Sequence, residues 1–209
     1  FPQERMKVTL DWCQKLGVHT VAGLNEAVRS GTIKAIATEA LALYEKSLDA
    51  AAEKVLTRLN QGDRLRMIWV SGPSSSGKTT TTVKLTQRLE QRGLRFLMLN
   101  LDDYFWSLVD HPTDWINDRN YETPEALDIQ LLNQHLQSLL AGHAIEKPVY
   151  SFKQGRRTGT KLVKLEADQI LLLDCLHGFY PPINEGIDPS AQFRLYIETQ
   201  LTLFEGDGH

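Results

Sequence analysis

The sequence has few of the residues that build cross-linked, zinc-bound or membrane-spanning proteins. Its two cysteines, Cys13 and Cys175, are far apart and form no CxxC motif, which argues against a disulfide framework and a structural zinc site. No apolar run approaches the roughly 20 residues that a transmembrane helix needs. The first residues, FPQERMKV, lack the apolar segment of a signal peptide. We therefore expect reduced thiols and a cytoplasmic location.

The chain also lacks a strong excess of charge of either sign. Its 209 residues carry a net charge of −3, with 23% charged and 42% apolar residues. This balance gives no electrostatic reason to expect a nucleic acid or a membrane as a partner, and it contains no signal for an oligomeric state. The length suits one domain with an appendage. Because the chain has no initiator Met and stops at FEGDGH, we expect it to be part of a longer protein.

Apolar periodicity divides the chain into a helical extension, residues 1–62, and an α/β region, residues 63–209. In the extension, apolar residues recur every three to five positions from Ile33 to Leu59, which predicts a long helix that ends at Gly62. The second region alternates short apolar runs with helical patterns over 78–92 and 124–141, where Thr123 is the expected N-cap. A loop and hairpin are expected over 150–165. The expected buried strands are MIWVS (67–71), RFLMLNL (95–101), QILLLDC (169–175) and FRLYIET (193–199). This order predicts an α/β fold with a doubly wound, mostly parallel sheet.

A phosphate-binding loop is the strongest motif of the chain. The segment GPSSSGKT at 72–79 fits GxxxxGK[ST] without a mismatch and lies between a predicted strand and a predicted helix. Gly72 and Gly77 let the loop wrap closely around phosphates, and the helix that begins at Lys78 presents its positive end to them. Lys78 would reach the β- and γ-phosphates, and Thr79 would bind magnesium. The predicted ligands are ATP and Mg²⁺, and the loop residues Ser74, Ser75, Ser76 and Thr80 complete the predicted binding site.

Acidic residues follow two of the other predicted strands. Asp102 and Asp103 come directly after the second strand, and Asp174 lies at the end of the third. Because strand ends line the ligand crevice of an open α/β sheet, Asp102 could accept a proton from a substrate hydroxyl, and Asp174 could hold magnesium. Asp103 is expected to be structural. The alternative for Asp102 is a solvated turn or a helix cap.

The order of these motifs resembles the uridine kinase and phosphoribulokinase family of P-loop kinases. The resemblance rests on GPSSSGKTT, LDDYF, NYETPEALD, KPVYSFKQGRR and ILLLDCLHG, and runs from about Met67 to Glu198. It is most similar to the bacterial branch in which a TGS domain precedes the kinase domain, through LGVHTVAGLNEAV (16–28). The family implies an ATP-dependent kinase that acts on a small metabolite, such as a nucleoside or a sugar-like alcohol.

The resemblance also implies roles for single residues. Asp102 matches the catalytic base, with Lys78 beside the transferred phosphate. Glu122 matches an acid that holds a ribose. Tyr150 and Phe152 match a pair of aromatic residues around the pyrimidine. Arg157 matches an arginine at the edge of that pocket.

The sequence departs from the family pattern at three points. Gly155 stands where uridine kinases have a histidine that reads the base, and Asp174 with Cys175 replaces a Glu-Gly pair. The family's arginine-rich lid would follow the fourth strand, so we expect the region 63–209 to be truncated before it. An ATP-binding regulatory module with little transfer activity therefore stays open as an alternative. Another class of P-loop hydrolase is disfavoured because no NKxD or LSGGQ motif is present.

Overall fold

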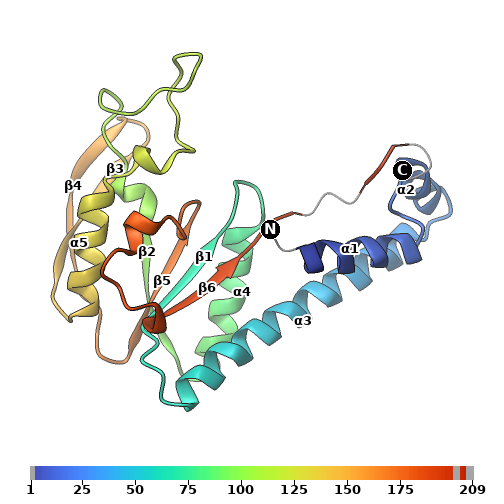
Figure 1. Ribbon diagram of the computed structural model, residues 1–209, viewed down its shortest axis with the longest axis horizontal. Helices are drawn as coiled ribbons and strands as arrows, with labels where there is room; N and C mark the ends of the chain where they lie inside the picture. Colours follow the sequence, from blue (N-terminus) through green and yellow to red (C-terminus); the bar gives the residue numbers. More distant parts are fainter. Residues whose placement is uncertain (1–2, 200–202, 206–209) are drawn as a thin grey trace. The chain divides into compact units, whose positions relative to one another are not determined.

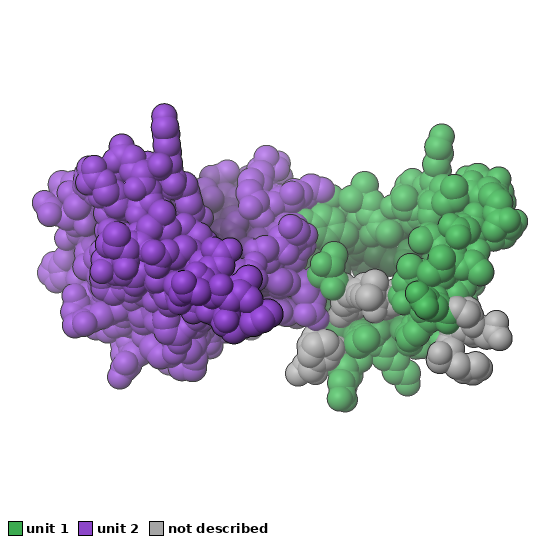
Figure 2. Space-filling model, turned by 90° about the horizontal axis from the view of Figure 1, so that it is seen from above, with its two compact units in different colours: residues 1–49, 199–209 green, residues 50–198 purple. Residues whose placement is uncertain are grey.

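The computed structural model describes residues 3–199 and 203–205. Contacts divide the chain into two compact units, residues 1–49 with 199–209 and residues 50–198, shown in different colours in Figure 2. The division falls inside one long helix, α3 (Ile33–Asn60). The predicted boundary between residues 62 and 63 stays a prediction. Within the described residues, no helix is long and apolar enough to cross a membrane.

The first unit is built from helices. It contains α1 (Gln3–Lys15), α2 (Val21–Arg29) and the first part of α3. Thr20 caps α2, because its side chain accepts a hydrogen bond from the Gly23 amide at 3.1 Å. A small apolar core forms around Cys13, Val18 and Ala27. The helices expected in this region are confirmed, and α3 ends at Asn60, two residues before Gly62 with its φ of 85°.

The second unit contains a sheet of four parallel strands in the order β2-β5-β1-β6. Their bounds are β1 (Met67–Ser71), β2 (Arg95–Asn100), β5 (Gln169–Cys175) and β6 (Gln192–Tyr196). Helix α4 (Lys78–Glu90) connects β1 to β2. A separate antiparallel hairpin comprises β3 (Ile145–Ser151) and β4 (Arg156–Val163). The predicted α/β class, the parallel sheet and the hairpin are confirmed, although the hairpin begins five residues before the expected position 150.

Both faces of this sheet are covered (Figure 1). One core contains the side chains of Met67, Trp69, Leu171 and Leu173, packed with α5 (Ile129–Leu140) and the hairpin. The other core contains the alternate residues of the same strands, packed with α4 and the last turns of α3: Ile68, Val70, Ile170 and Leu172. Because successive side chains point to opposite faces, a strand that is covered on both faces reads as a continuous apolar run.

Two details of the elements differ from the sequence-based expectation. The second strand was expected to be buried, but β2 is an edge strand, and Met98 is 59% exposed. The helix expected from Pro124 begins instead at Ile129, because a 3₁₀ turn at 124–126 precedes it. Asp128, not Thr123, is its N-cap, and the Asp128 carboxylate accepts a hydrogen bond from the Leu131 amide at 3.1 Å. The cap therefore lies five residues later than expected.

Candidate active site

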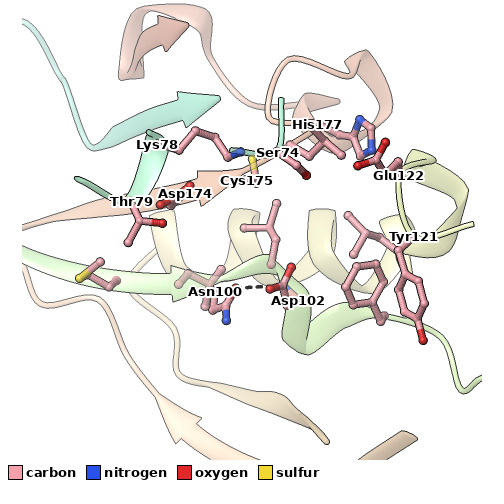
Figure 3. A pocket seen from close by; sticks show the side chains of 16 residues that line it. Ser74, Lys78, Thr79, Asn100, Asp102, Tyr121, Glu122, Asp174, Cys175 and His177 are labelled. Atoms are coloured by element: carbon pink, nitrogen blue, oxygen red, sulfur yellow. Dashed lines mark hydrogen bonds between the residues drawn. The ribbon is translucent and has the colours of Figure 1, made fainter. Parts of the chain in front are cut away.

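The candidate site lies at the carboxyl edge of the parallel sheet. Strand β5 is placed between β1 and β2, so that Asp174 pairs with Val70 on one side and with Asn100 on the other. The loops that follow these three strands therefore meet, as expected for an open α/β sheet. They surround a cavity of about 620 Å³. Six of the predicted site residues line it together (Figure 3): Ser74, Lys78, Thr79, Asp102, Glu122 and Asp174.

The phosphate-binding loop requires its two glycines. A Cβ atom on Gly72 would lie 1.8 Å from the carbonyl oxygen of Ile197, so the loop packs directly against the chain that leaves β6. Gly77 has a φ of 88°, and Ser75 adopts the same left-handed region at 61°. A non-glycine residue in this region is strained and often marks a functional loop.

The start of α4 is arranged to receive an anion. Gly77 is the N-cap and has no side chain to cap the first amides, so these amides can bind a ligand. The Lys78 Nζ donates to the backbone oxygen of Pro73 at 2.7 Å, which folds the ammonium over the loop. The Ser76 hydroxyl is buried without a hydrogen-bond partner. These groups fit a phosphate, because each offers a donor near the helix end.

Asp174 and Thr79 form the oxygen pair that could hold a magnesium ion. Hydrogen bonds from Thr82, at 3.3 Å, and from Thr79 reach the Asp174 carboxylate. Burial raises the pKa of Asp174, while the charge of Lys78 and these hydrogen bonds oppose the rise. Hard oxygen ligands suit Mg²⁺, which keeps waters and phosphate oxygens in its shell. No cluster of three or more His, Cys, Asp or Glu residues suited to a metal occurs in the described chain.

Asp102 lies in a short 3₁₀ turn directly after β2. The side chain of Asn100 caps the turn by accepting a hydrogen bond from the Asp102 amide at 3.1 Å. The Asp102 side chain lines the cavity with Lys78 and Asp174. Burial raises the pKa of Asp102, the charges of Asp103 and Asp174 add to the rise, and Lys78 opposes it. A raised pKa brings a carboxylate closer to the range of a useful general base.

Asp103 points away from the cavity and holds the hairpin. Its carboxylate forms a partly buried ion pair with Lys147 and accepts a hydrogen bond from the Tyr150 amide at 3.0 Å. Both partners belong to β3. This is the structural role expected of Asp103.

Arg157 is bonded to the protein on three sides. Its guanidinium donates to the Asp128 carboxylate at 3.1 Å, to the Tyr104 carbonyl at 2.8 Å and to the Phe105 carbonyl at 3.2 Å. It also lies over the Trp106 ring, 5.3 Å from its centroid. Arg157 does not line the cavity. The residue expected at the edge of a base pocket therefore fastens β4 to the turn that carries Asp102.

The aromatic residues form one cluster around Phe105. Its ring centroid lies 5.4 Å from that of Tyr121, 5.7 Å from that of Tyr150 and 6.1 Å from that of Phe152. Phe105 and Tyr121 line the cavity, whereas the two aromatic residues chosen from the sequence, Tyr150 and Phe152, do not. Tyr150 is buried behind Phe105, and Phe152 is 61% exposed. The spacing of the motifs alone gave no sign that Phe105 would be the central ring.

His177 is a cavity residue that the sequence reasoning missed. It lies in the turn after β5, and its side chain lines the cavity beside that of Glu122 (Figure 3). Glu122 is exposed to the cavity. Its backbone amide donates a hydrogen bond to the side-chain oxygen of Asn120 at 3.0 Å. Its position in the sequence could have indicated this, because His177 follows Asp174, at the end of a predicted strand, by three residues.

Gly155 has a structural reason to be glycine. Its φ is 61°, and a Cβ atom there would lie 2.2 Å from Cδ1 of Leu108. The Leu108 amide also donates to the Gly155 carbonyl at 2.8 Å. The turn of the hairpin thus packs against the loop after Asp102, where the Leu108 side chain occupies the position of a Cβ atom. A histidine at this position would be strained by the positive φ and would require the Leu108 side chain to move.

Known proteins are similar to this chain in sequence and in fold. Residues 67–203 match the model of the "Phosphoribulokinase / Uridine kinase family". The uridine kinase of Halobacterium salinarum is 30% identical over 132 residues, which cover 63% of this chain and 56% of that protein. That of Bacillus pumilus is 30% identical over 137 residues, or 66% of this chain and 62% of that protein. The chain thus spans less than two thirds of the length of these relatives.

A solved structure shares the fold. The structure of a possible uridine kinase from Bacillus stearothermophilus superposes with a TM-score of 0.52 at 20% identity, covering 63% of this chain and 70% of that chain. This likeness concerns the architecture, whereas the match over residues 67–203 concerns the sequence. The chain therefore belongs to the phosphoribulokinase/uridine kinase family.

Proposed function

We propose that the protein transfers the γ-phosphate of ATP to a hydroxyl of a small metabolite, which is a nucleoside or a sugar-like alcohol. The observation that carries the proposal is that Lys78 of the phosphate-binding loop and Asp102 line one cavity. A phosphate donor and a hydroxyl acceptor can meet there. Family membership supports the same reaction class.

Different residues of this chain have separate roles in the phosphate transfer. The loop amides and Lys78 hold the phosphates, and the positive end of α4 stabilises their charge. Asp102 takes the proton of the acceptor hydroxyl, whose oxygen forms the new bond to the γ-phosphorus. The bond from that phosphorus to the bridging oxygen breaks, and ADP leaves with the electron pair. Thr79 and Asp174 would hold Mg²⁺, which supplies charge neutralisation on the phosphates when bound.

The acceptor end of the cavity supports a ring-bearing alcohol. The Glu122 carboxylate would accept hydrogen bonds from hydroxyl groups, while Phe105 and Tyr121 offer aromatic faces to a ring. Tyr150 and Phe152 contact Phe105 as a proposed second layer, and Arg157 donates a hydrogen bond to the Phe105 carbonyl. A nucleoside combines hydroxyl groups with a flat ring, so it fits both kinds of wall.

Two further proposals concern the domain organisation of the protein. We infer that residues 1–62 are a helical extension joined to a kinase region at 63–209. We also infer that the protein belongs to the branch with a preceding TGS domain, on the strength of the segment 16–28. Sequencing of the complete gene tests the second proposal, because a TGS domain must then be encoded upstream.

An ATP-binding module without transfer is the second candidate. It is favoured by Gly155, which stands where the expected reader of the base would be and whose positive φ disfavours any other side chain. The two candidates differ in their products. A kinase consumes an acceptor and releases ADP in proportion, whereas a module binds ATP and releases none.

An acceptor screen on the full-length protein decides between them. Purified protein is mixed with ATP, magnesium and single nucleosides, sugars or polyols, and ADP release is followed with a coupled assay. We expect acceptor-dependent ADP release that disappears in the Lys78→Ala variant. ATP binding without ADP release for every acceptor would reject the kinase and support the module.

A further inference from the structure

The long loop between Phe105 and Tyr121 carries large apolar side chains that face solvent. Trp115 is 93% exposed, and its neighbour Ile116 is 61% exposed. Figure 1 shows this loop, in yellow-green, extending beyond the carboxyl edge of the sheet. Single exposed apolar residues are ordinary on a protein surface. An almost fully exposed tryptophan beside an exposed isoleucine is instead typical of a residue that anchors a protein–protein interface.

The tip of this loop, residues 113–119, is held by hydrogen bonds within the loop. The Asp114 carboxylate accepts hydrogen bonds from the amides of Ile116 and Asp118, each at 2.9 Å. The Asp114 amide also donates to the Asp118 carbonyl at 2.8 Å. Trp115 is therefore presented from a turn that is already ordered, which lowers the entropy cost of inserting its side chain into a partner.

The charge around Trp115 indicates what kind of surface would cover it. Residues 109–119 contain three aspartates and one arginine, which give a net charge of −2 with the histidine neutral. Two of these aspartates, Asp110 and Asp118, are exposed. Such a loop is repelled by a nucleic acid or an anionic membrane. It is complementary to an apolar pocket with basic residues around its opening.

A second cavity, of about 610 Å³, lies at the opposite edge of the same sheet. Its walls are the segment before β1, the end of α5 and the segment between β4 and β5. Because the strands are parallel, this edge carries their starting ends, while the loop of Trp115 follows the carboxyl end of β2 (Figure 1). Leu65 and Leu165 line the second cavity and are buried, whereas Arg64 and Lys164 line it and are exposed. The volume lies within the range of small-molecule pockets, roughly 300 to 1,000 Å³, so one tryptophan side chain fits.

Basic side chains outnumber acidic ones around the second cavity. Its charged lining residues are Arg64, Arg66, Lys164, Asp63 and Glu166. The Asp63 carboxylate is paired with Arg58 at 2.7 Å. Glu166 lies 3.9 Å from Lys164, and both of these side chains are more than half exposed. An exposed ion pair of this length contributes little to stability, so Lys164 is able to pair with a carboxylate from another molecule. The second cavity thus offers an apolar interior and an excess of positive charge.

We propose that Trp115 of one molecule inserts into the second cavity of another copy of this chain, so that the protein associates head to tail. The aspartates beside Trp115 then face Arg64 and Lys164. The tip and the second cavity lie at opposite edges of one sheet, so a molecule does not fill its own cavity. Two different surfaces meet, so each added copy leaves one tip and one cavity free, and the assembly grows unless a ring closes. One tryptophan buries roughly 150–250 Å², well below the about 800 Å² per partner of stable complexes, so the association is weak and concentration-dependent.

Sedimentation velocity of the full-length protein at increasing protein concentration tests the proposal. We expect the mean sedimentation coefficient to rise with concentration, and to rise less at high salt because salt screens the charges. Trp115→Ala should raise the apparent Kd about tenfold or more, as for the loss of an interface anchor. The double variant Arg64→Glu with Lys164→Glu should weaken the association as well. Its matched control, Lys153→Glu with Lys161→Glu, makes the same change of charge at two exposed lysines outside the second cavity and should leave the association unchanged.

A mixture of the two defective proteins tests the pairing itself. Trp115→Ala keeps an intact cavity, and Arg64→Glu with Lys164→Glu keeps an intact tip. The mixture should form a 1:1 complex that grows no further, which would also show that both variants are folded. Failure of the mixture to associate would overturn the pairing of these two surfaces. A sedimentation coefficient that does not rise with concentration, or a rise that Trp115→Ala leaves unchanged, would overturn the proposal and leave the tip to a different partner.

Discussion

Arg157 donates a hydrogen bond to the carboxylate of Asp128 at 3.1 Å, and both side chains are largely buried. Asp128 is at the same time the N-cap of α5. The ion pair therefore joins the hairpin, the helix and the turn after Asp102. The same contacts therefore stabilise the fold and fix the turn that carries the proposed base.

We predict that Arg157→Met lowers the free energy of unfolding by roughly 3 kcal/mol, because it leaves the Asp128 carboxylate buried without its partner. Chemical denaturation measures the loss. The double variant Arg157→Met with Asp128→Asn should be more stable than Arg157→Met alone, since the uncompensated charge is removed. Equal stability of Arg157→Met and the unmodified protein would show that the pair contributes nothing.

Asp102→Asn tests the proposed base, since it keeps the size of the side chain and removes the proton acceptor. We expect kcat to fall by roughly a hundredfold or more, while ATP affinity changes little. Asp103→Asn should cost less in kcat, because Asp103 is engaged with Lys147 and the Tyr150 amide. Steady-state kinetics with the best acceptor give both values, and the reverse order of effects would assign the base to Asp103.

The pH dependence of the rate follows from the raised pKa of Asp102. The base must be ionised, so kcat/KM should fall as the pH decreases through a pKa that lies above the ordinary value for aspartate. Asp103 contributes to that rise through its charge. Asp103→Asn should therefore shift the acid limb of the profile to lower pH. An acid limb that stays in place, or moves to higher pH, would contradict this source of the shift.

Gly155 and Gly142 provide a matched pair for the packing of the hairpin turn. Both have positive φ, 61° and 80°, but only a Cβ at Gly155 would meet a neighbour, Leu108. Replacement by Ala costs backbone strain at both positions, about 1 kcal/mol or more, and Gly155→Ala adds the overlap with Leu108. We expect Gly155→Ala to lower Tm clearly more than Gly142→Ala. Equal changes in Tm would mean that the loop moves aside freely.

The sequence predicted those parts of the molecule that depend on neighbouring residues. The apolar runs of β1 and β5 and the motif from Gly72 to Thr79 are local signals, and the strand end at Asp174 follows from them. The predicted start of α5 was wrong because Thr123-Pro124 has the pattern of a helix start. In the structure these residues begin a 3₁₀ turn, and α5 begins after its N-cap, Asp128.

Other features depend on contacts between distant segments. Phe105 is a central ring because β3 and the loop before α5 both pack on it. Nothing in its own neighbourhood in the sequence shows this. The cavity position of His177 likewise depends on the distant residue Glu122, and the requirement for glycine at 155 depends on Leu108.

The most direct test of the account is the effect of ATP with magnesium on the thermal midpoint of the full-length protein. A ligand that binds only the folded state stabilises it by about 2.7 kcal/mol at a hundred times its Kd. We predict a clear rise of the midpoint at millimolar ATP, and the loss of most of that rise in Lys78→Ala. An unchanged midpoint in the unmodified protein would contradict the assignment of the phosphate-binding loop and, with it, the proposed kinase.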